Sequence, residues 1–174
     1  MSLSLHTASV PVFVRSLEAL SAILDKAAAH CVAKKIDPAV LGATRLIPDM
    51  FALSRQVQIA CDFAKNGAAR LAGDEAPKYD DTEKTIEELK GRIERTVAFV
   101  KGLEPSAVDA GAGREIVFPV GPNQMKMPGE AYLLHFVMPN FHFHLCMAYA
   151  ILRQAGIDIG KRDFMGAVPD LRPA

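Results

Sequence analysis

Apolar residues recur at alternating intervals of three and four positions along four long segments of this sequence. An α-helix completes one turn in about 3.6 residues, so this spacing draws one apolar stripe along each segment. Four amphipathic helices joined by modest loops bury their stripes against one another. The pattern therefore predicts an all-α fold, a four-helix bundle, with helices at 5–35, at 48–72, from about Thr82 to Gly102, and at 130–155.

Capping and proline signals indicate where these helices begin and bend. Pro48 suits the first turn of the second helix, where a missing N–H costs least. Asp81 or Thr82 is the predicted N-cap of the third helix, because either side chain can accept from a free backbone N–H. Pro139 falls inside the fourth helix, so we expect it to kink that helix and to free the carbonyl of His135.

The segment between the third and fourth helices has a different pattern. Residues 115–120 partly alternate apolar and polar side chains, and Gly121-Pro122-Asn123 is a turn signal. Residues 124–127 can return along the first run, so the pattern permits a short β-hairpin before the last helix. The tail at 158–174 contains two glycines and two prolines and is expected to wrap the surface.

Length and charge narrow the class of protein. A chain of 174 residues can bury one substantial core, so we expect a single domain over residues 1–174. The 20 basic residues are balanced by 20 acidic ones. Nucleic acids and anionic membranes both select a surplus of Lys and Arg, so neither is expected as a partner. The most apolar stretch, Tyr132–Met138, is too short to span a bilayer.

The three cysteines, Cys31, Cys61 and Cys146, show no CxxC spacing. An odd number without that spacing is not a disulfide framework. Each lies among apolar residues of a predicted helix, so each is predicted to be a small, buried and reduced side chain. Reduced thiols suit the cytosol, and residues 1–14 lack the features of a signal peptide, so we expect a cytoplasmic protein.

Asn140 and His144 are the strongest candidates for a functional site. They lie one helical turn apart on the stripe of the fourth helix and point the same way. Gln56, at the edge of the second helix's stripe, is predicted to reach the same layer, and Asp49 is a further acidic candidate. Two interpretations are open: a small polar pocket between the second and fourth helices, or a satisfied polar layer that sets the register of the helices.

The remaining histidines and cysteines do not suggest a second site. His142 and Cys146 are one turn apart, but they face nearly opposite to His144. Because His142 and His144 are two positions apart, a regular helix cannot bring both to one ion. The sequence contains no Gly-rich phosphate loop, no GxSxG and no HExxH motif. Motifs alone therefore identify no reaction.

Several short segments together carry a resemblance to known proteins. They are Asp49-Met50-Phe51, the run at 56–60, Pro139-Asn140-Phe141 with His144, the run at 149–153 followed by Gly156, and the run at 160–164. These segments resemble a bacterial family of unknown function, DUF1993, which is similar to the DinB/YfiT-like superfamily of metalloenzymes. The resemblance covers nearly the whole chain, and it implies a four-helix bundle that is often dimeric.

The resemblance also implies a metal site. Typical DinB-like proteins hold a divalent metal with three histidines, one from the second helix and two spaced HxxxH on the fourth, and relatives include transferases that use mycothiol or bacillithiol. Aligned on this pattern, His144 takes the place of the second HxxxH histidine, Asn140 that of the first, and Gln56 that of the histidine on the second helix. Neutral amides are poor zinc ligands, so His144 is the only strong candidate. We therefore expect no tightly bound zinc, while weak binding of a divalent metal stays open.

Three functions are compatible with these observations. The first is binding of a small molecule in a pocket formed by Gln56, Asn140 and His144. The second is a metal-dependent reaction, similar to that of a thiol transferase or a hydrolase, at a degenerate metal site. The third is a non-catalytic interaction protein that acts as a homodimer, because the fourth helix is apolar on more faces than one core requires.

Overall fold

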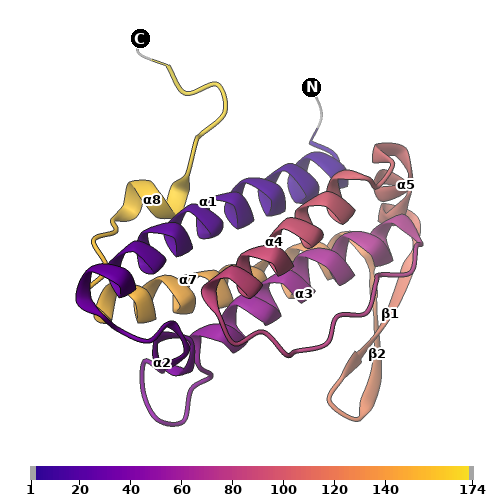
Figure 1. Ribbon diagram of the computed structural model, residues 1–174. Helices are drawn as coiled ribbons and strands as arrows, with labels where there is room; N and C mark the ends of the chain where they lie inside the picture. Colours follow the sequence, from indigo (N-terminus) through magenta and orange to yellow (C-terminus); the bar gives the residue numbers. More distant parts are fainter. Residues whose placement is uncertain (1–2, 173–174) are drawn as a thin grey trace.

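Four long helices lie side by side in the computed structural model, which describes residues 3–172 (Figure 1). They are α1 (Leu5–Lys34), α3 (Leu53–Ala72), α4 (Ile86–Lys101) and α7 (Met138–Gln154). Both α4 and α7 contact α1 and α3, so the four helices close around a common core. The predicted all-α, four-helix-bundle fold is confirmed.

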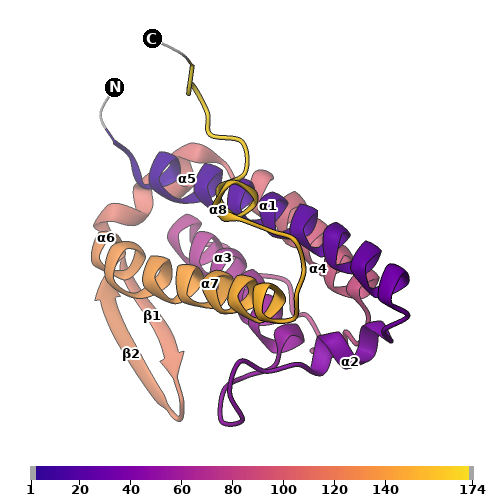
Figure 2. The ribbon, with the colours of Figure 1, turned by 90° about the vertical axis from the view of Figure 1, so that its left-hand side faces the viewer.

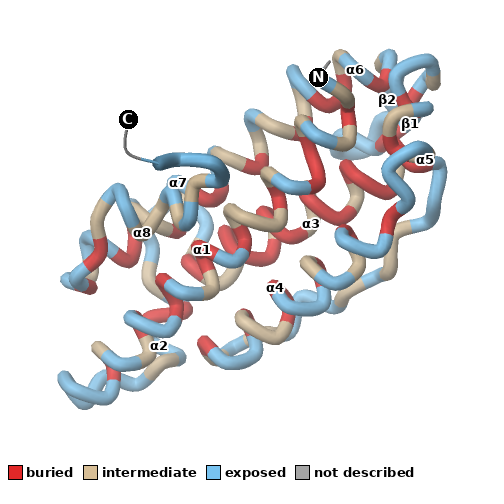
Figure 3. The backbone as a smooth tube through the Cα atoms, turned by 90° about the horizontal axis from the view of Figure 1, so that it is seen from above, coloured by how far each residue is buried: buried red, intermediate tan, exposed pale blue. Residues whose placement is uncertain are grey.

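The predicted apolar stripes form that core (Figure 3). In α1, Phe13, Leu17 and Leu24 have no exposed surface. In α3, small residues let the neighbouring helices approach closely: a Cβ atom added to Gly67 would lie 2.6 Å from Cγ1 of Val137. Because interiors are packed at close to crystal density, this spacing requires a residue without a side chain.

The segment between α1 and α3 differs from the prediction. A short helix, α2 (Pro38–Ala43), follows α1, and the side chain of Asp37 caps it by accepting from the N–H of Ala39. Six residues are too few to show an apolar period, so the sequence pattern missed it. The second long helix was predicted from Pro48, and this start is wrong. The N–H of Leu53, where α3 begins, donates to the carbonyl of Thr44, which holds residues 44–52 in a loop.

The third long helix, α4, also begins later than predicted. Its N-cap is Thr85, whose hydroxyl accepts from the N–H of Glu88, while the Glu88 carboxylate accepts from the N–H of Thr85. This capping box satisfies two backbone donors at once. Asp81 and Thr82, the predicted caps, lie in the loop before the helix.

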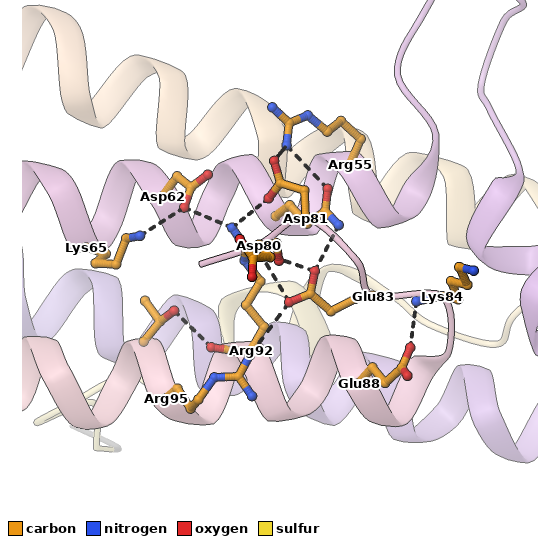
Figure 4. Close-up of polar contacts among 12 residues, drawn as sticks. Arg55, Asp62, Lys65, Asp80, Asp81, Glu83, Lys84, Glu88, Arg92 and Arg95 are labelled. Atoms are coloured by element: carbon orange, nitrogen blue, oxygen red, sulfur yellow. Dashed lines mark hydrogen bonds and ion pairs between the residues drawn. The ribbon is translucent and has the colours of Figure 1, made fainter. Parts of the chain in front are cut away.

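A buried arginine holds that loop in place (Figure 4). Arg92 of α4 is fully buried, and its guanidinium donates to Asp62 of α3 at 2.9 Å and to Glu83 at 3.2 Å. It also pairs with Asp81, with 3.0 Å between Nη2 and Oδ1. Asp81 therefore binds a side chain of α4 instead of capping the start of that helix.

The hairpin before the last helices is present. β1 (Glu115–Val120) and β2 (Asn123–Pro128) pair antiparallel in a two-stranded sheet. Ile116 and Phe118 are buried against the bundle, whereas Val117, on the other face, is exposed. The segment leading into the hairpin contains α5 (Pro105–Asp109) and the 3₁₀ turn η1 (Ala110–Gly113).

The last helical segment is not one regular helix. The helix predicted at 130–155 is divided into α6 (Gly129–Tyr132), the π-turn η2 (Leu133–Val137) and α7. Pro139 has no N–H for the carbonyl of His135, and its ring would clash with that carbonyl in a regular helix. The wider π-turn directly before the proline accommodates it, so the expected disturbance takes this form.

The C-terminal segment lies across α1 (Figure 2). α8 (Lys161–Met165) packs against α1, and Asp163 pairs with Lys26 at 2.6 Å. The ring of Phe164 meets Tyr149 of α7 edge-on, with centroids 5.6 Å apart. The tail thus wraps the surface as predicted; residues 173–174, like 1–2 at the other end, lie outside the described residues.

The cysteines follow the prediction in two cases of three. Cys31 and Cys61 are buried, but Cys146 is exposed, so its predicted burial is wrong. Position 146 lies about 200° around α7 from position 144. Since His144 faces α3, the Cys146 side of the helix faces solvent.

Within residues 3–172, α1 is the one helix that is long and apolar enough to cross a membrane by composition. Its most apolar window of 18 residues has a mean hydropathy of 1.3, and half of that window is buried inside the bundle. The central helix of a helical bundle shares these properties.

Candidate functional site

Gln56 and His144 meet at the interface between α3 and α7. Nδ1 of His144 lies 2.7 Å from Oε1 of Gln56, across 88 positions of sequence. Both side chains are buried, with 1% and 7% of their surface exposed. Two of the four candidate residues are therefore in direct contact.

The backbone of the loop before α3 orients this pair. The side-chain nitrogen of Gln56, Nε2, donates to the backbone carbonyl of Phe51 at 3.2 Å. The side-chain oxygen, Oε1, is therefore the atom that faces His144. An amide oxygen only accepts, hence Nδ1 of His144 carries the proton. The lone pair then lies on Nε2, which has no hydrogen-bond partner within residues 3–172 and is not fully shielded from solvent.

Burial keeps this imidazole neutral. Desolvation lowers the pKa of His144 from 6.5 to about 4, and the positive charge of Arg55 acts in the same direction. The ring of Phe63 stacks on the imidazole with centroids 5.9 Å apart, and Phe143 meets it edge-on at 5.2 Å. At neutral pH the site presents an uncharged base between two aromatic rings.

This low pKa should make the acid stability of the protein depend on His144. The unfolded chain takes up a proton near pH 6.5, whereas the folded protein takes it up near pH 4. The free energy of unfolding should therefore fall as the pH drops from 6.5 to 4. Above pH 6.5 the contribution of His144 to this free energy should be constant. The difference between a pKa of 6.5 and one of about 4 corresponds to roughly 3 kcal/mol.

Urea denaturation of the wild type and of His144→Gln between pH 4 and 7 measures the pH-dependent contribution of His144 to the free energy of unfolding. The variant should lose the extra dependence on pH, while His142→Gln, a change at a half-buried histidine of the same helix, should keep it. Equal pH dependence in all three proteins would contradict the assigned pKa of His144.

The other two candidates lie apart from this pair. Asn140 is half-buried, and its amide nitrogen donates to the carbonyl of Phe136 at 2.7 Å, one turn back on its own helix. Its side chain makes no hydrogen bond to Gln56 or His144. Asp49 is exposed in the turn before α3 and forms no ion pair within residues 3–172.

On α3 and in the loop before it, three residues at the site did not emerge from the sequence. Every residue type has a backbone carbonyl, so the sequence did not indicate that the carbonyl of Phe51 would take part. Phe63 lies two helical turns beyond Gln56, and that spacing on α3 was a usable signal. Arg55 precedes Gln56 directly, and its effect on His144 follows only from the packing of α3 against α7.

The donor set does not fit the three-histidine metal site of typical DinB-like proteins. Oε1 of Gln56 already accepts from His144, so it is not free to face an ion. Nδ1 of His142 lies 2.8 Å from the carbonyl of Met138 and is engaged within α7. Across residues 3–172, no group of three His, Cys, Asp or Glu side chains is arranged to hold a metal. One imidazole nitrogen is therefore the only strong donor at this site.

Comparison with known proteins places the chain among DinB-like bundles. A sequence profile described as "Domain of unknown function (DUF1993)" matches residues 5–165. A crystal structure described as a DinB family member protein from Shewanella denitrificans is 40% identical, covers 97% of this chain and 96% of its own, and superposes with a TM-score of 0.90. No match was found among curated proteins. The resemblance inferred from the sequence is confirmed.

Proposed function

The chain belongs to the DUF1993 family and has a DinB-like fold, and we propose that it binds a small neutral molecule at Nε2 of His144. The observation that carries this proposal is the hydrogen bond from Nδ1 of His144 to Gln56, itself oriented by the Phe51 carbonyl. That chain of hydrogen bonds fixes the tautomer and leaves a basic lone pair toward solvent.

The surroundings of Nε2 indicate the class of ligand. A neutral imidazole nitrogen accepts a hydrogen bond or a proton, so the ligand should carry an O–H, N–H or S–H donor. Phe63 and Phe143 flank the imidazole and favour an apolar or aromatic body beside that donor. Asn140 lies one turn earlier on α7, and its side-chain oxygen has no hydrogen-bond partner in residues 3–172, so we propose it as a second polar contact for the ligand.

Phenol is a suitable probe for this site, and anisole is its control without the hydroxyl. Phenol should move the ¹⁵N resonance of Nε2 of His144 saturably, whereas anisole should leave it unchanged. The phenol-dependent shifts of nearby backbone amides should disappear in His144→Phe and persist in His142→Phe. If anisole produced the same shifts, or if they persisted in His144→Phe, the proposal would be wrong.

A metal-dependent reaction at the same nitrogen is the alternative from the family resemblance. Catalytic zinc usually takes three protein ligands and a water, and here one imidazole is the only strong donor. We therefore predict much less than one zinc per chain after dialysis against a mild chelator, measured by elemental analysis. About one divalent ion per chain, lost in His144→Ala, would reverse this prediction and favour the metalloenzyme.

A second candidate function is that of a homodimeric interaction protein. Phe136, Asn140, Phe143 and Met147 fall on one stripe of the last helical segment, and none of them is fully buried. Half of the surface of Phe143 is exposed. We propose that a second copy covers this stripe, since two-fold homodimers are the commonest soluble oligomers.

Light scattering at tens of micromolar should then give the mass of a dimer. Phe143→Glu should give the mass of a monomer, because a charge in an apolar interface is costly. Val32→Glu, at an exposed apolar residue at the end of α1, should leave the dimer intact. A monomer mass for the wild type would exclude the homodimer.

A further inference from the structure

Four aromatic side chains surround a hollow beside the hairpin. Phe63 comes from α3, Phe118 from β1, Tyr132 from α6 and Phe136 from η2. Neighbouring ring centroids lie between 4.6 and 5.9 Å apart. The hollow has a volume of about 160 Å³, and a cavity of about 150 Å³ is known to admit benzene. The aromatic walls thus leave room for one ring.

A cation lies on the polar side of this hollow. Arg70, in the last turn of α3, lines the hollow together with Asn66, one turn earlier. The guanidinium of Arg70 is half-buried, and its one hydrogen bond within residues 3–172 goes to the neutral hydroxyl of Tyr132, at 3.0 Å. No carboxylate of the described residues lies within ion-pair distance of it. Arg70 therefore presents a positive charge that no ion pair neutralises.

Tyr132 adds a second donor at the same point. Burial raises the pKa of Tyr132, so its hydroxyl stays protonated at neutral pH. The hydroxyl oxygen accepts from Arg70, and its own proton is not donated to any described residue. A guanidinium and a phenol O–H thus converge beside the ring-sized hollow, which is the donor arrangement that a carboxylate requires.

The acidic residue at the rim does not oppose a negative ligand strongly. Asp62 also lines the hollow, but its carboxylate accepts from Arg92 at 2.9 Å and pairs with Lys65 at 3.3 Å. Lys65 and the shared charge of Arg92 therefore offset its negative charge. Beyond Arg70 and Asn66 the hollow continues into a wider, open depression beside residues 74–80.

We propose that this hollow binds a small monocarboxylic acid with a body of one ring. Its carboxylate contacts Arg70 and the hydroxyl of Tyr132, and its ring lies among Phe63, Phe118 and Phe136. The site is distinct from the His144 site, because Arg70 lies fourteen residues beyond Gln56 on α3, roughly 20 Å along the helix. Phe63 borders both sites. Each proposal has its own probe and variants, so the failure of one would not contradict the other.

Benzoate is the probe for this site, followed by ¹H–¹⁵N spectra of the full chain at constant ionic strength. Benzoate should shift the backbone signals of Asn66, Arg70 and Phe118 saturably at millimolar concentrations, and benzoate protons should show contacts to the rings of Phe118 and Phe136. Benzamide, which has the same shape without the charge, should bind at least about tenfold more weakly, because charged hydrogen bonds are the stronger ones.

Two variants and one control test the residues assigned to the site. Arg70→Gln should weaken benzoate binding at least about tenfold, and Tyr132→Phe, which keeps the ring, should weaken it several-fold. Arg153→Gln changes the exposed arginine in the last turn of α7 and should leave binding unchanged. Shifts that stay linear in benzoate, equal binding of benzamide, or undiminished binding in both site variants would overturn the proposal.

Discussion

Replacing Arg92 with methionine should lower the free energy of unfolding by about 3–5 kcal/mol, the cost of removing one partner from a buried ion pair. The methionine fills a similar volume, but it leaves the carboxylates of Asp62, Asp81 and Glu83 without their shared cation. The side chain of Glu83 is only 6% exposed, so water cannot replace the arginine there. Denaturation in urea at neutral pH, followed by helical circular dichroism, measures the loss.

Lys101→Met is the matched control for this experiment. Lys101 of α4 pairs with Glu18 of α1 at 2.8 Å, and about half of each side chain is exposed. Such a pair contributes about 0–1 kcal/mol, because water screens it. Hydrogen exchange should also quicken in the loop at 73–85 in Arg92→Met and not in Lys101→Met. Similar losses in the two variants would show that the burial of Arg92 does not set its contribution.

Gly129→Ala should destabilise the protein by about 3 kcal/mol or more, which is large for one methyl group. A Cβ atom at position 129 would lie 1.9 Å from the carbonyl oxygen of Gly111. That oxygen belongs to backbone that cannot withdraw, because a Cβ on Gly111 would itself lie 2.5 Å from the carbonyl oxygen of Leu71. At this point η1 is enclosed between α6 and the end of α3, so no side chain fits.

Gly91→Ala provides a control of the opposite sign. Gly91 lies within α4, where a new Cβ would be 3.6 Å from a guanidinium nitrogen of Arg95, an ordinary contact. Alanine is favoured over glycine inside a helix by about 1 kcal/mol, so this variant should be more stable. Thermal unfolding of both variants tests the argument. A Gly129→Ala protein as stable as the wild type would show that η1 can move away from α6.

The candidate site was predictable in its central pair and not in its surroundings. Gln56 and His144 lie on the facing sides of two predicted helices, so the stripes alone brought them to one layer. Asn140 shares the stripe with His144, yet its side chain turns back to the carbonyl of Phe136. Helical spacing gives the direction of a Cβ atom but not the rotamer, and Asn readily bonds its own backbone. Asp49 depended on a helix start at Pro48 that the loop does not adopt.

The hollow at Arg70 had no signal in the sequence. Its aromatic walls come from α3, β1, α6 and η2, and each of these residues alone reads as an ordinary core position. What distinguishes the place is that no carboxylate within residues 3–172 pairs with Arg70. Whether a cation is paired depends on every element packed around it, and local patterns hold no information on that.

The number and order of the long helices, the hairpin and the disturbance at Pro139 follow from the sequence by itself, because they depend on side chains within one or two turns of each other. The starts of α3 and α4 were decided by the tertiary structure. The N–H of Leu53 bonds to Thr44, and Asp81 is drawn to Arg92. The tertiary structure also decided which imidazole nitrogen of His144 carries the proton, because the Phe51 carbonyl orients Gln56 and Gln56 accepts from Nδ1. In each case a group has several acceptable local partners, and only the packed chain determines which of them is within 3 Å or so.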